Sequence, residues 1–280
     1  MRSALITGAS TGIGRAAALR LDAEGWRVFA GVRREEDAAA LREAASGRLA
    51  PVMLDVTDAE QIAGAVRTVE AEVGEAGLDG LVNNAGIAVL SPLETIPVDD
   101  FRRQLEVNLV AQVTVTQAFL SLIRRATGRV VFVSSIGGRM SLPFGAPYHA
   151  SKHGIEAVAD CLRQELHPWN IGVSVIEPGS IDTPIWERGE AIAEEVSSRA
   201  HSSQEELYGE TIERFRAAVR RTAERGIAPE KVAAAIFHAL AASRPRTRYL
   251  VGADARAQAV ARRLLPDRAF DAMVRRVMRL

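Results

Sequence analysis

Short apolar runs alternate with longer amphipathic stretches along the first two-thirds of the chain. The short runs are almost continuously apolar, which is typical of strands covered on both faces; they are Ala4–Thr7, Arg27–Val32, Ala50–Leu54, Gly80–Asn83, Arg129–Ser134 and Gly172–Ile176. Helical patterns separate them, for example Ile13–Glu24, Ala59–Val73, Phe101–Arg125 and Ala150–Leu166. This alternation predicts right-handed crossovers and therefore an α/β fold, a doubly wound parallel sheet with helices on both faces.

The pattern changes after Pro184. Residues from Trp186 to Arg225 are charged and helical, and they contain no strand candidate. Pro229 begins another helix, since a first turn does not need the missing N–H, and Arg248–Val251 is a last short strand. Because the chain shows no internal repeat and no linker rich in Pro and Ser, we expect a single domain over residues 1–280.

Composition limits the partners and the compartment. The 35 basic and 35 acidic side chains cancel, which argues against a nucleic-acid binder, because such proteins need a basic surface. The single cysteine, Cys161, cannot form an intramolecular disulfide, and its helical neighbours predict a small buried hydrophobe. No apolar run approaches the length of a membrane span, and the first strand leaves no room for a secretory signal. We therefore expect a cytoplasmic protein with no integral membrane segment.

A glycine-rich segment follows the first strand, where the first helix begins: Thr7-Gly8-Ala9-Ser10-Thr11-Gly12-Ile13-Gly14. Glycines there allow a tight turn and a close approach of pyrophosphate to the backbone, and the helix N-terminus offers N–H groups to the anion. Its position in a βαβ unit distinguishes it from a plain tight turn. We expect a dinucleotide held by Gly8, Ser10, Thr11, Gly12, Ile13 and Gly14.

The end of the second strand discriminates between the two nicotinamide dinucleotides. A site that prefers NAD(H) usually has an acid there, which bonds the ribose 2′-hydroxyl. This strand ends in Val32-Arg33-Arg34 instead. Arg33 is suited to binding a 2′-phosphate, whereas Arg34 is more typical of a solvated surface arginine. We therefore expect NADP(H), with NAD(H) as the less favoured alternative.

Four segments together resemble the short-chain dehydrogenase/reductase family over nearly the whole chain. They are Thr7–Gly14, Asn83-Asn84-Ala85-Gly86 after the fourth strand, Tyr148-His149-Ala150-Ser151-Lys152 with Ser135 thirteen residues upstream, and Pro178-Gly179 followed by Thr183. The residues around Ser134–Lys152 are similar to the steroid and retinoid branch. The resemblance implies a Rossmann-type fold and hydride transfer between NADP(H) and a ketone or secondary alcohol. It also implies a homodimer or homotetramer built on the long helices that contain Asn108 and Tyr148.

The resemblance further implies a catalytic set of Asn108, Ser135, Tyr148 and Lys152. Tyr148 and Lys152 share a helix face, because they are four residues apart. The nearby ammonium, with the positive nicotinamide, is expected to lower the phenol pKa from its usual value of about 10. The Ser135 hydroxyl can donate to the substrate oxygen as negative charge develops there. Asn108, a poor helix former, matches the family residue that holds a proton-relay water beside the lysine.

The remaining cofactor contacts are implied by the same resemblance. They are Asp55 and Val56 at the adenine, Asn84, Ala85 and Gly86 at the ribose, Pro178 and Gly179 after the sixth strand, and Ile181 and Thr183 at the nicotinamide. Tyr148 and Lys152 also belong to this site, since Lys152 is expected to hold the nicotinamide ribose. His149 and His153 are four residues apart, but no carboxylate or third histidine completes a metal site. We expect both histidines to be structural, and no metal.

Residues 184–226 are where this family has its substrate lid. Their apolar side chains, with Leu142, Pro143 and Phe144, are expected to wall a pocket for a fairly large apolar alcohol or ketone; they are Ile185, Trp186, Leu207, Tyr208, Ile212 and Phe215. The helical tail, 254–280, has an apolar stripe at Phe270, Met273, Val274 and Val277. Such a stripe is typical of a helix docked on the body or on a second subunit, and a membrane-surface helix is the alternative.

Two other functions share part of this sequence pattern. A regulatory module that only senses NADP(H) would keep the glycine loop and lose the catalytic set, which is complete here. Sugar-nucleotide epimerases usually have a longer chain and a Gly-x-x-Gly-x-x-Gly loop, and neither feature is found. The sequence thus favours an oxidoreductase over a silent NADP(H)-binding module.

Overall fold

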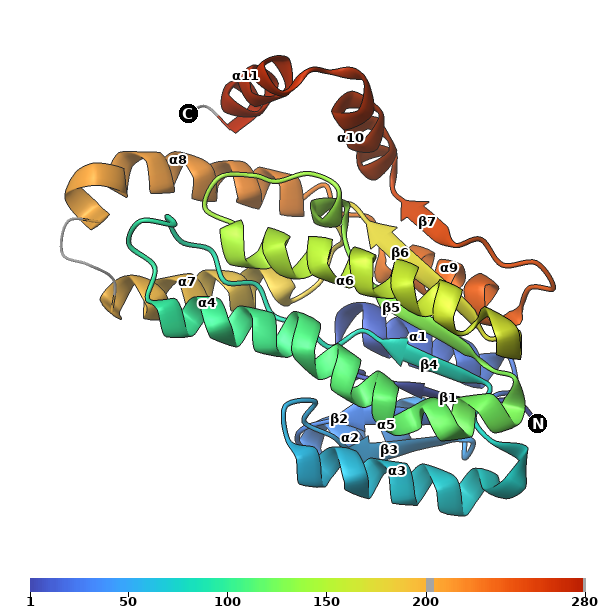
Figure 1. Cartoon of the computed structure of the whole chain (residues 1–280). Coiled ribbons are helices and arrows are strands. Elements are labelled where there is room, and N and C mark those ends of the chain that lie inside the picture. Colours follow the sequence, from blue (N-terminus) through green and yellow to red (C-terminus); the bar gives the residue numbers. More distant parts are fainter. Residues whose placement is uncertain (200–203, 279–280) are drawn as a thin grey trace.

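The computed structural model describes residues 1–199 and 204–278, and its helices cover both faces of one seven-stranded sheet (Figure 1). All strand pairs are parallel, in the order β3-β2-β1-β4-β5-β6-β7. The strands are β1 (Ser3–Ile6), β2 (Arg27–Val32), β3 (Leu49–Met53), β4 (Gly80–Asn83), β5 (Arg129–Val133), β6 (Gly172–Pro178) and β7 (Arg248–Val251). The doubly wound fold and all seven predicted strands are confirmed, with ends that differ by at most two residues.

The direction in which the sheet grows reverses at β1. β2 and β3 extend it to one side, and β4 to β7 extend it to the other. At such a switch point the loops that leave neighbouring strands diverge, and ligands bind beyond the carboxyl ends of the strands. The glycine loop, the segment Asn84–Gly86, Ser135 and Gly179 follow these ends, whereas Asn108, Tyr148 and Lys152 lie on helices.

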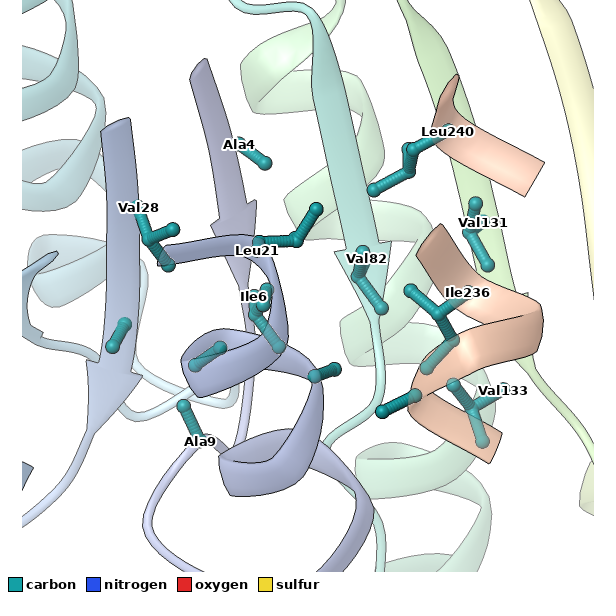
Figure 2. Packing of buried hydrophobic residues seen from close by; sticks show 14 of the residues in the cluster. Ala4, Ile6, Ala9, Leu21, Val28, Val82, Val131, Val133, Ile236 and Leu240 are labelled. Carbon is teal, nitrogen blue, oxygen red and sulfur yellow. The ribbon is translucent and has the colours of Figure 1, made fainter. Parts of the chain in front are cut away.

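Two layers of helices bury the sheet. α1 (Gly12–Ala23), α2 (Glu35–Ala44) and α9 (Pro229–Ala241) cover one face, and α3 (Ala59–Val73), α5 (Ala111–Ala126) and α6 (Ala146–Glu165) cover the other. Figure 2 shows the first layer, in which Leu21 of α1 and Leu240 of α9 pack over β1, β4 and β5. Each such side chain contributes roughly 1.5–3 kcal/mol when fully buried, so the strand ends that carry the site are firmly held.

The predicted helix Phe101–Arg125 is interrupted. α4 (Val98–Leu105) and α5 are joined by η2, a π-helical turn over Glu106–Val110. Asn108 lies in this turn and is fully buried. Because π-turns are frequent at functional sites, this interruption supports the prediction that Asn108 is a site residue.

The stretch Val98–Ala126 also has the length and apolar composition of a membrane span. One run therefore does reach this length, contrary to the sequence prediction. Within the fold, 44% of its apolar window is buried, and Val115, Phe119 and Leu122 belong to the core beneath the sheet. Length and composition are weak evidence for a span here, because a buried core helix has the same properties.

The last third of the chain forms the lid and the tail. The lid consists of α7 (Ile185–Arg199) and α8 (Gln204–Ala223), and the tail of α10 (Ala253–Leu264) and α11 (Asp267–Met278). α11 lies on α8 (Figure 1), and Phe270 and Val274 share a buried cluster with Phe215. The predicted docking of the tail on the body is thus observed, although Val277 is 64% exposed. Residues 200–203 of the predicted lid and 279–280 of the predicted tail lie outside the described residues.

Cys161 is exposed, contrary to the prediction of a buried side chain. The buried face of this part of α6 contains Ile155 and Ala159. A residue two positions after Ala159 points away from that face, because helix neighbours recur at three or four residues. The sequence pattern thus predicted the helix correctly and the face of the cysteine wrongly.

Candidate active site

Three glycines shape the loop after β1. Gly8 and Gly12 have φ angles of +65° and +54°, which side chains rarely adopt. A Cβ on Gly14 would lie 2.2 Å from the Gly8 carbonyl oxygen, so only glycine lets the first turn of α1 pack on the loop. Ser10 and Thr11 lie in the turn between them. The predicted glycine positions therefore have the geometry of a phosphate-binding loop.

The N-terminus of α1 lacks the groups that usually neutralise it. Thr11 occupies the N-cap position without a side-chain hydrogen bond, and the first turn, which includes Ile13, has no acidic residue. The first N–H groups of the helix and the positive end of its dipole are therefore available to an anion. This arrangement fits the pyrophosphate of a dinucleotide.

The two arginines after β2 differ in their partners. Arg34 is bound to Asp37 through hydrogen bonds of 3.0 and 3.2 Å. The Arg33 side chain is 68% exposed, and its Nη1 lies 3.9 Å from Asp55 Oδ2, beyond the end of β3. A loose, exposed pair of this kind contributes little, so the Arg33 guanidinium can turn to another anion. Val56, next to Asp55, is buried.

Asn84 ties the loop after β4 to the glycine loop. Its Nδ2 donates to the Thr7 and Gly8 carbonyl oxygens at 2.9 and 3.0 Å. The Thr7 hydroxyl in turn accepts hydrogen bonds from the backbone N–H groups of Asn84 and Ala85. The segments predicted to hold the phosphates and the ribose are therefore side by side and mutually fixed.

Ser135, Tyr148 and Lys152 meet beyond the carboxyl end of β5. The Ser135 hydroxyl accepts from the Gly137 N–H at 3.0 Å, and it is near enough to the Tyr148 hydroxyl to lower its pKa. Lys152, one turn later on α6, is buried and donates from Nζ to the Val133 carbonyl at 2.9 Å. Its Nζ lies 5.8 Å from the centre of the Tyr148 ring. Three of the four predicted catalytic side chains are thus within reach of one another.

Burial controls the protonation of this group. It raises the pKa of the Tyr148 phenol, and the nearby Ser135 hydroxyl opposes this only in part. In the free protein the pKa of Tyr148 is therefore above its usual value, and the lowering expected from Lys152 together with the bound, positive nicotinamide stays a prediction. Burial also lowers the pKa of Lys152 to about 8, against the raising effect of Glu156. Both groups therefore carry their proton at neutral pH, which suits a phenol that donates one.

Asn108 holds the backbone just beyond Gly86. Its Oδ1 accepts from the Ile87 N–H at 2.8 Å, and its Nδ2 donates to the Ile87 carbonyl at 3.0 Å. A Cβ on Gly86 would lie 3.2 Å from Asn108 Oδ1, so glycine permits this approach. The side chain therefore positions the loop after β4, and its role beside the lysine stays a prediction.

The loop after β6 connects the glycine loop with the lid and the tail. A Cβ on Gly12 would lie 3.0 Å from Thr183 Cγ2, so the two segments are in contact. The buried Ile181 accepts from Trp186 Nε1 at 2.8 Å through its carbonyl. A Cβ on Gly179, which follows Pro178, would lie 2.3 Å from the Asp254 carboxylate. The predicted nicotinamide-end residues are thus brought next to the predicted phosphate-end residues.

His149 is fixed by two backbone groups. Its Nδ1 lies 3.0 Å from the Gly137 carbonyl, and its Nε2 accepts from the Leu142 N–H at 3.0 Å. Burial lowers the pKa of His149, so the neutral ring holds the loop that follows Ser135. These two contacts support the structural interpretation of His149. The described residues contain no cluster of three potential metal ligands.

A pocket lies between the lid helices and the loop after β4. Its apolar walls come from Leu90, Phe144, Ala193, Ile212, Phe215 and Val219. Phe144 packs edge-on against Phe215, with ring centres 5.2 Å apart. Ile212 and Phe215 face this pocket as predicted, whereas Leu207 is 56% exposed.

Sequence reasoning missed two kinds of polar residue in this region. Asp254, in the first turn of α10, accepts from the Ser180 N–H at 2.7 Å and so ties the tail to the loop after β6. Glu156 and Glu177 are buried beside the catalytic group. The sequence does contain a signal for Glu177, because an acid within an apolar strand is expected to be buried and therefore to need a partner. Asp254 gave no such signal, because its partner is distant in sequence.

Comparisons with known proteins identify the family. Residues 2–192 match the family model described as short chain dehydrogenase. The chain is 38% identical over 275 residues to retinol dehydrogenase 5 of Mus musculus, covering 96% of this chain and 86% of the relative. It is 36% identical over 276 residues to an NADPH-dependent 3-dehydrocapnine reductase of Ornithobacterium rhinotracheale, covering 97% and 95%. A short chain dehydrogenase from Burkholderia cenocepacia, solved in complex with NADP, has a TM-score of 0.74 and 26% identity, covering 99% of both chains.

These relatives do not support a catalytically silent module. The matching family model, the steroid and retinoid type of relative and the NADP-bound structural neighbour all point to one reaction class. This chain belongs to the short-chain dehydrogenase family and is an NAD(P)-dependent oxidoreductase that acts on CH–OH groups.

Proposed function

We propose that this protein interconverts an apolar ketone and its secondary alcohol with NADP(H), using Tyr148 to transfer the proton. The observation that carries this proposal is the cluster of Ser135, Tyr148 and Lys152 at the carboxyl edge of the sheet. Bound NADPH supplies the hydride for reduction of the ketone. The residues of this chain bind and orient the reactants and move the proton.

In the direction of reduction, Tyr148 donates its proton from Oη to the substrate oxygen. Its raised pKa keeps the phenol protonated until charge develops on that oxygen. Ser135, which lies near the phenol, donates to the same oxygen and stabilises the developing negative charge. The Lys152 ammonium stabilises the phenolate that remains, and Asn108 fixes the loop beside them.

Four observations support NADP(H) over NAD(H). β2 ends without an acid, and Arg33 is exposed beside the site. The relative from Ornithobacterium rhinotracheale is NADPH-dependent, and the Burkholderia cenocepacia neighbour was solved with NADP. In this proposal Arg33 binds the 2′-phosphate, Asp55 borders the adenine, and Asn84 fixes the loop at the ribose.

The substrate we propose has a large apolar body. The pocket under α7 and α8 has mainly apolar walls, and one relative is a retinol dehydrogenase. A screen of retinoids, steroids, small ketones and sugars, followed by NADPH absorbance, tests this substrate class. We expect kcat/KM to be highest for a large apolar carbonyl compound; a preference for sugars would contradict the proposal.

We also propose a cytoplasmic homodimer or homotetramer without an integral membrane segment. The surface of α4, η2 and α5 supports the assembly, because the apolar Val110 is 46% exposed there and a second subunit would cover it. The buried part of the same helix supports a soluble location. Sedimentation of the purified protein tests both statements: a monomer at micromolar concentration, or a requirement for detergent, would contradict them.

A further inference from the structure

Two glutamates are buried beside the catalytic group. Glu177 of β6 is fully buried, and Glu156 of α6 is 8% exposed. Alternation along β6 puts Glu177 on the same face as Val175, which packs in the core that α6 covers. A carboxylate in such surroundings is costly unless it is paired, so the partners of these two acids decide what they do.

Arginines pair with one oxygen of each acid: Arg248 with both acids, and Arg139 with Glu177 alone. Arg248 Nε donates to Glu156 Oε2 at 3.1 Å and lies 3.3 Å from Glu177 Oε1, which also accepts from Arg139 Nη2 at 2.8 Å. Among the described residues, Glu156 Oε1 and Glu177 Oε2 are buried without a hydrogen-bond partner, as is the Ser134 hydroxyl. Arg248 therefore fixes the Glu156 side chain and leaves one of its oxygens unneutralised.

Glu156 lies one helical turn after Lys152 on the same face of α6. Gly138 marks the point where this face meets the loop after β5. A Cβ there would lie 3.0 Å from both Glu156 Cγ and the Lys152 carbonyl oxygen, and 2.8 Å from Ser134 Oγ. Lys152 is only 5% exposed, so its ammonium has lost most of its water. A buried ammonium needs a nearby negative charge to keep its proton.

The other charged groups around Lys152 do not supply that charge. Glu177 of β6, which packs on α6, is paired with both Arg139 and Arg248. Asp160, one turn beyond Glu156, is paired with Arg163 and Arg248. Glu106 of η2, which packs on α6, is exposed. Arg139 and Arg248 are cations, and His149 is neutral because burial lowers its pKa. Glu156 is the group that raises the pKa of Lys152 against the effect of burial.

We propose that Glu156 is a positioning residue for catalysis, whose buried carboxylate, held by Arg248, keeps Lys152 charged so that Lys152 can act on Tyr148. Only the last step rests on the proposed function, since the coupling between Glu156 and Lys152 exists whatever the reaction is. The competing interpretation is that Glu156 merely anchors Arg248 and β7. A glutamine could still accept the Arg248 hydrogen bond, so Glu156→Gln separates the two.

The chain has only two lysines, Lys152 and Lys231, so NMR of protein with ¹³C-labelled lysine gives two side-chain signals. Lys231 is exposed on α9 and serves as the internal reference, and Lys231→Arg assigns the signals. The titration midpoint of Lys152 is then measured in wild type, in Glu156→Gln and in a matched control, Glu165→Gln. Glu165 belongs to the same helix but is exposed.

We expect Lys152 to titrate near pH 8 in wild type and about one unit lower or more in Glu156→Gln. The midpoint in Glu165→Gln should equal that of wild type. An unchanged midpoint in Glu156→Gln would overturn the proposal. Should that variant fail to fold, the wild-type titration still decides: a midpoint below 7 overturns the proposal, because Lys152 would then be neutral despite Glu156, and one at 7 or above supports it.

Turnover gives a second readout. In Glu156→Gln the alkaline fall of kcat should move to lower pH by the same amount as the Lys152 midpoint, and the KM for the ketone should change little. If the midpoint shifts while Lys152→Ala keeps its activity, the proposed function fails and the coupling stands. If Lys152→Ala is inactive while Glu156→Gln leaves the midpoint in place, only the role of Glu156 fails.

Discussion

The sheet framework, which is residues 1–183 with α9 and β7, and the lid with the tail, which are α7, α8, α10 and α11, are stabilised in different ways. In the framework, core side chains such as Leu5, Leu81 and Phe132 are completely buried. The lid helices instead carry exposed ion pairs, for example Arg220–Glu190 and Arg216–Glu213. Exposed ion pairs contribute at most about 1 kcal/mol each, so the lid has fewer strong contacts to lose when it moves.

This difference matches the tasks of the two regions. The groups that must hold a fixed geometry, from Gly14 to Lys152, all lie on the framework, where the surrounding core determines their positions. The walls of the pocket come largely from the lid. The residues that line the pocket can therefore differ without disturbing the geometry of the catalytic groups, so one reaction can be applied to different substrates.

The largest effect is expected where the framework holds the catalytic lysine. Lys152→Ala removes the only ammonium beside Tyr148 among the described residues and should lower kcat about 10²–10⁴-fold, with weaker NADPH binding as well. Steady-state kinetics and cofactor titration measure both. Lys231→Ala, at the only other lysine and on the surface, is the matched control and should behave as wild type. Activity of Lys152→Ala within tenfold of wild type would contradict the role of Lys152 in catalysis.

Next comes the glycine loop. Gly14→Ala forces a Cβ to within 2.2 Å of the Gly8 carbonyl, so the loop or α1 must shift. We expect a stability loss of about 1–3 kcal/mol and NADPH binding at least tenfold weaker. Gly64→Ala is the control, because its Cβ would meet no atom closer than 3.7 Å and alanine favours the helix. Thermal unfolding and fluorescence titration give the comparison; equal behaviour of the two variants would contradict it.

A smaller effect is expected at the edge of the framework. Arg33→Ala should weaken NADPH binding about tenfold and leave NADH binding nearly unchanged, since a charge-assisted bond at an exposed site contributes roughly 1.5 kcal/mol. The ratio of NADPH affinity to NADH affinity in wild type should fall as the salt concentration is raised. Arg34→Ala is the control, because Arg34 is already paired with Asp37. NADH binding as tight as NADPH binding in wild type would mean that Arg33 is only a surface residue.

The smallest change is expected in the lid itself. Backbone amides of α7 and α8 should exchange hydrogen faster than those of α6 in the free protein, and should slow when cofactor and an apolar ketone are bound together. Hydrogen exchange measured by mass spectrometry reports both helices in one experiment. Equally slow exchange of α6 and α8 in the free protein would remove the contrast between framework and lid.

The framework was predictable from the sequence because its signals are local. Continuous apolar runs gave all seven strands, and the spacing of Ser135, Tyr148 and Lys152 placed three side chains that do meet. The glycine loop was predictable for the same reason, since glycine is the residue type that readily adopts the positive φ angles of this loop.

The remainder depends on contacts between distant segments. The raised pKa of Tyr148 follows from burial that no spacing reveals, and the π-turn at Asn108 interrupts an otherwise regular helical pattern. The tie between Asp254 and Ser180 joins residues 74 positions apart. The exposed face of Cys161 depends on which side of α6 meets the sheet.

Tyr148→Phe tests the central claim most directly, because it removes the transferable proton and keeps the ring. Hydride transfer from NADPH to a ketone that wild type reduces should be measured in a single turnover, with NADPH affinity measured on the same samples. We predict a loss of at least about 10²-fold in the transfer rate, with NADPH affinity within about threefold of wild type. A variant that transfers hydride at close to the wild-type rate would show that Tyr148 is not the proton donor.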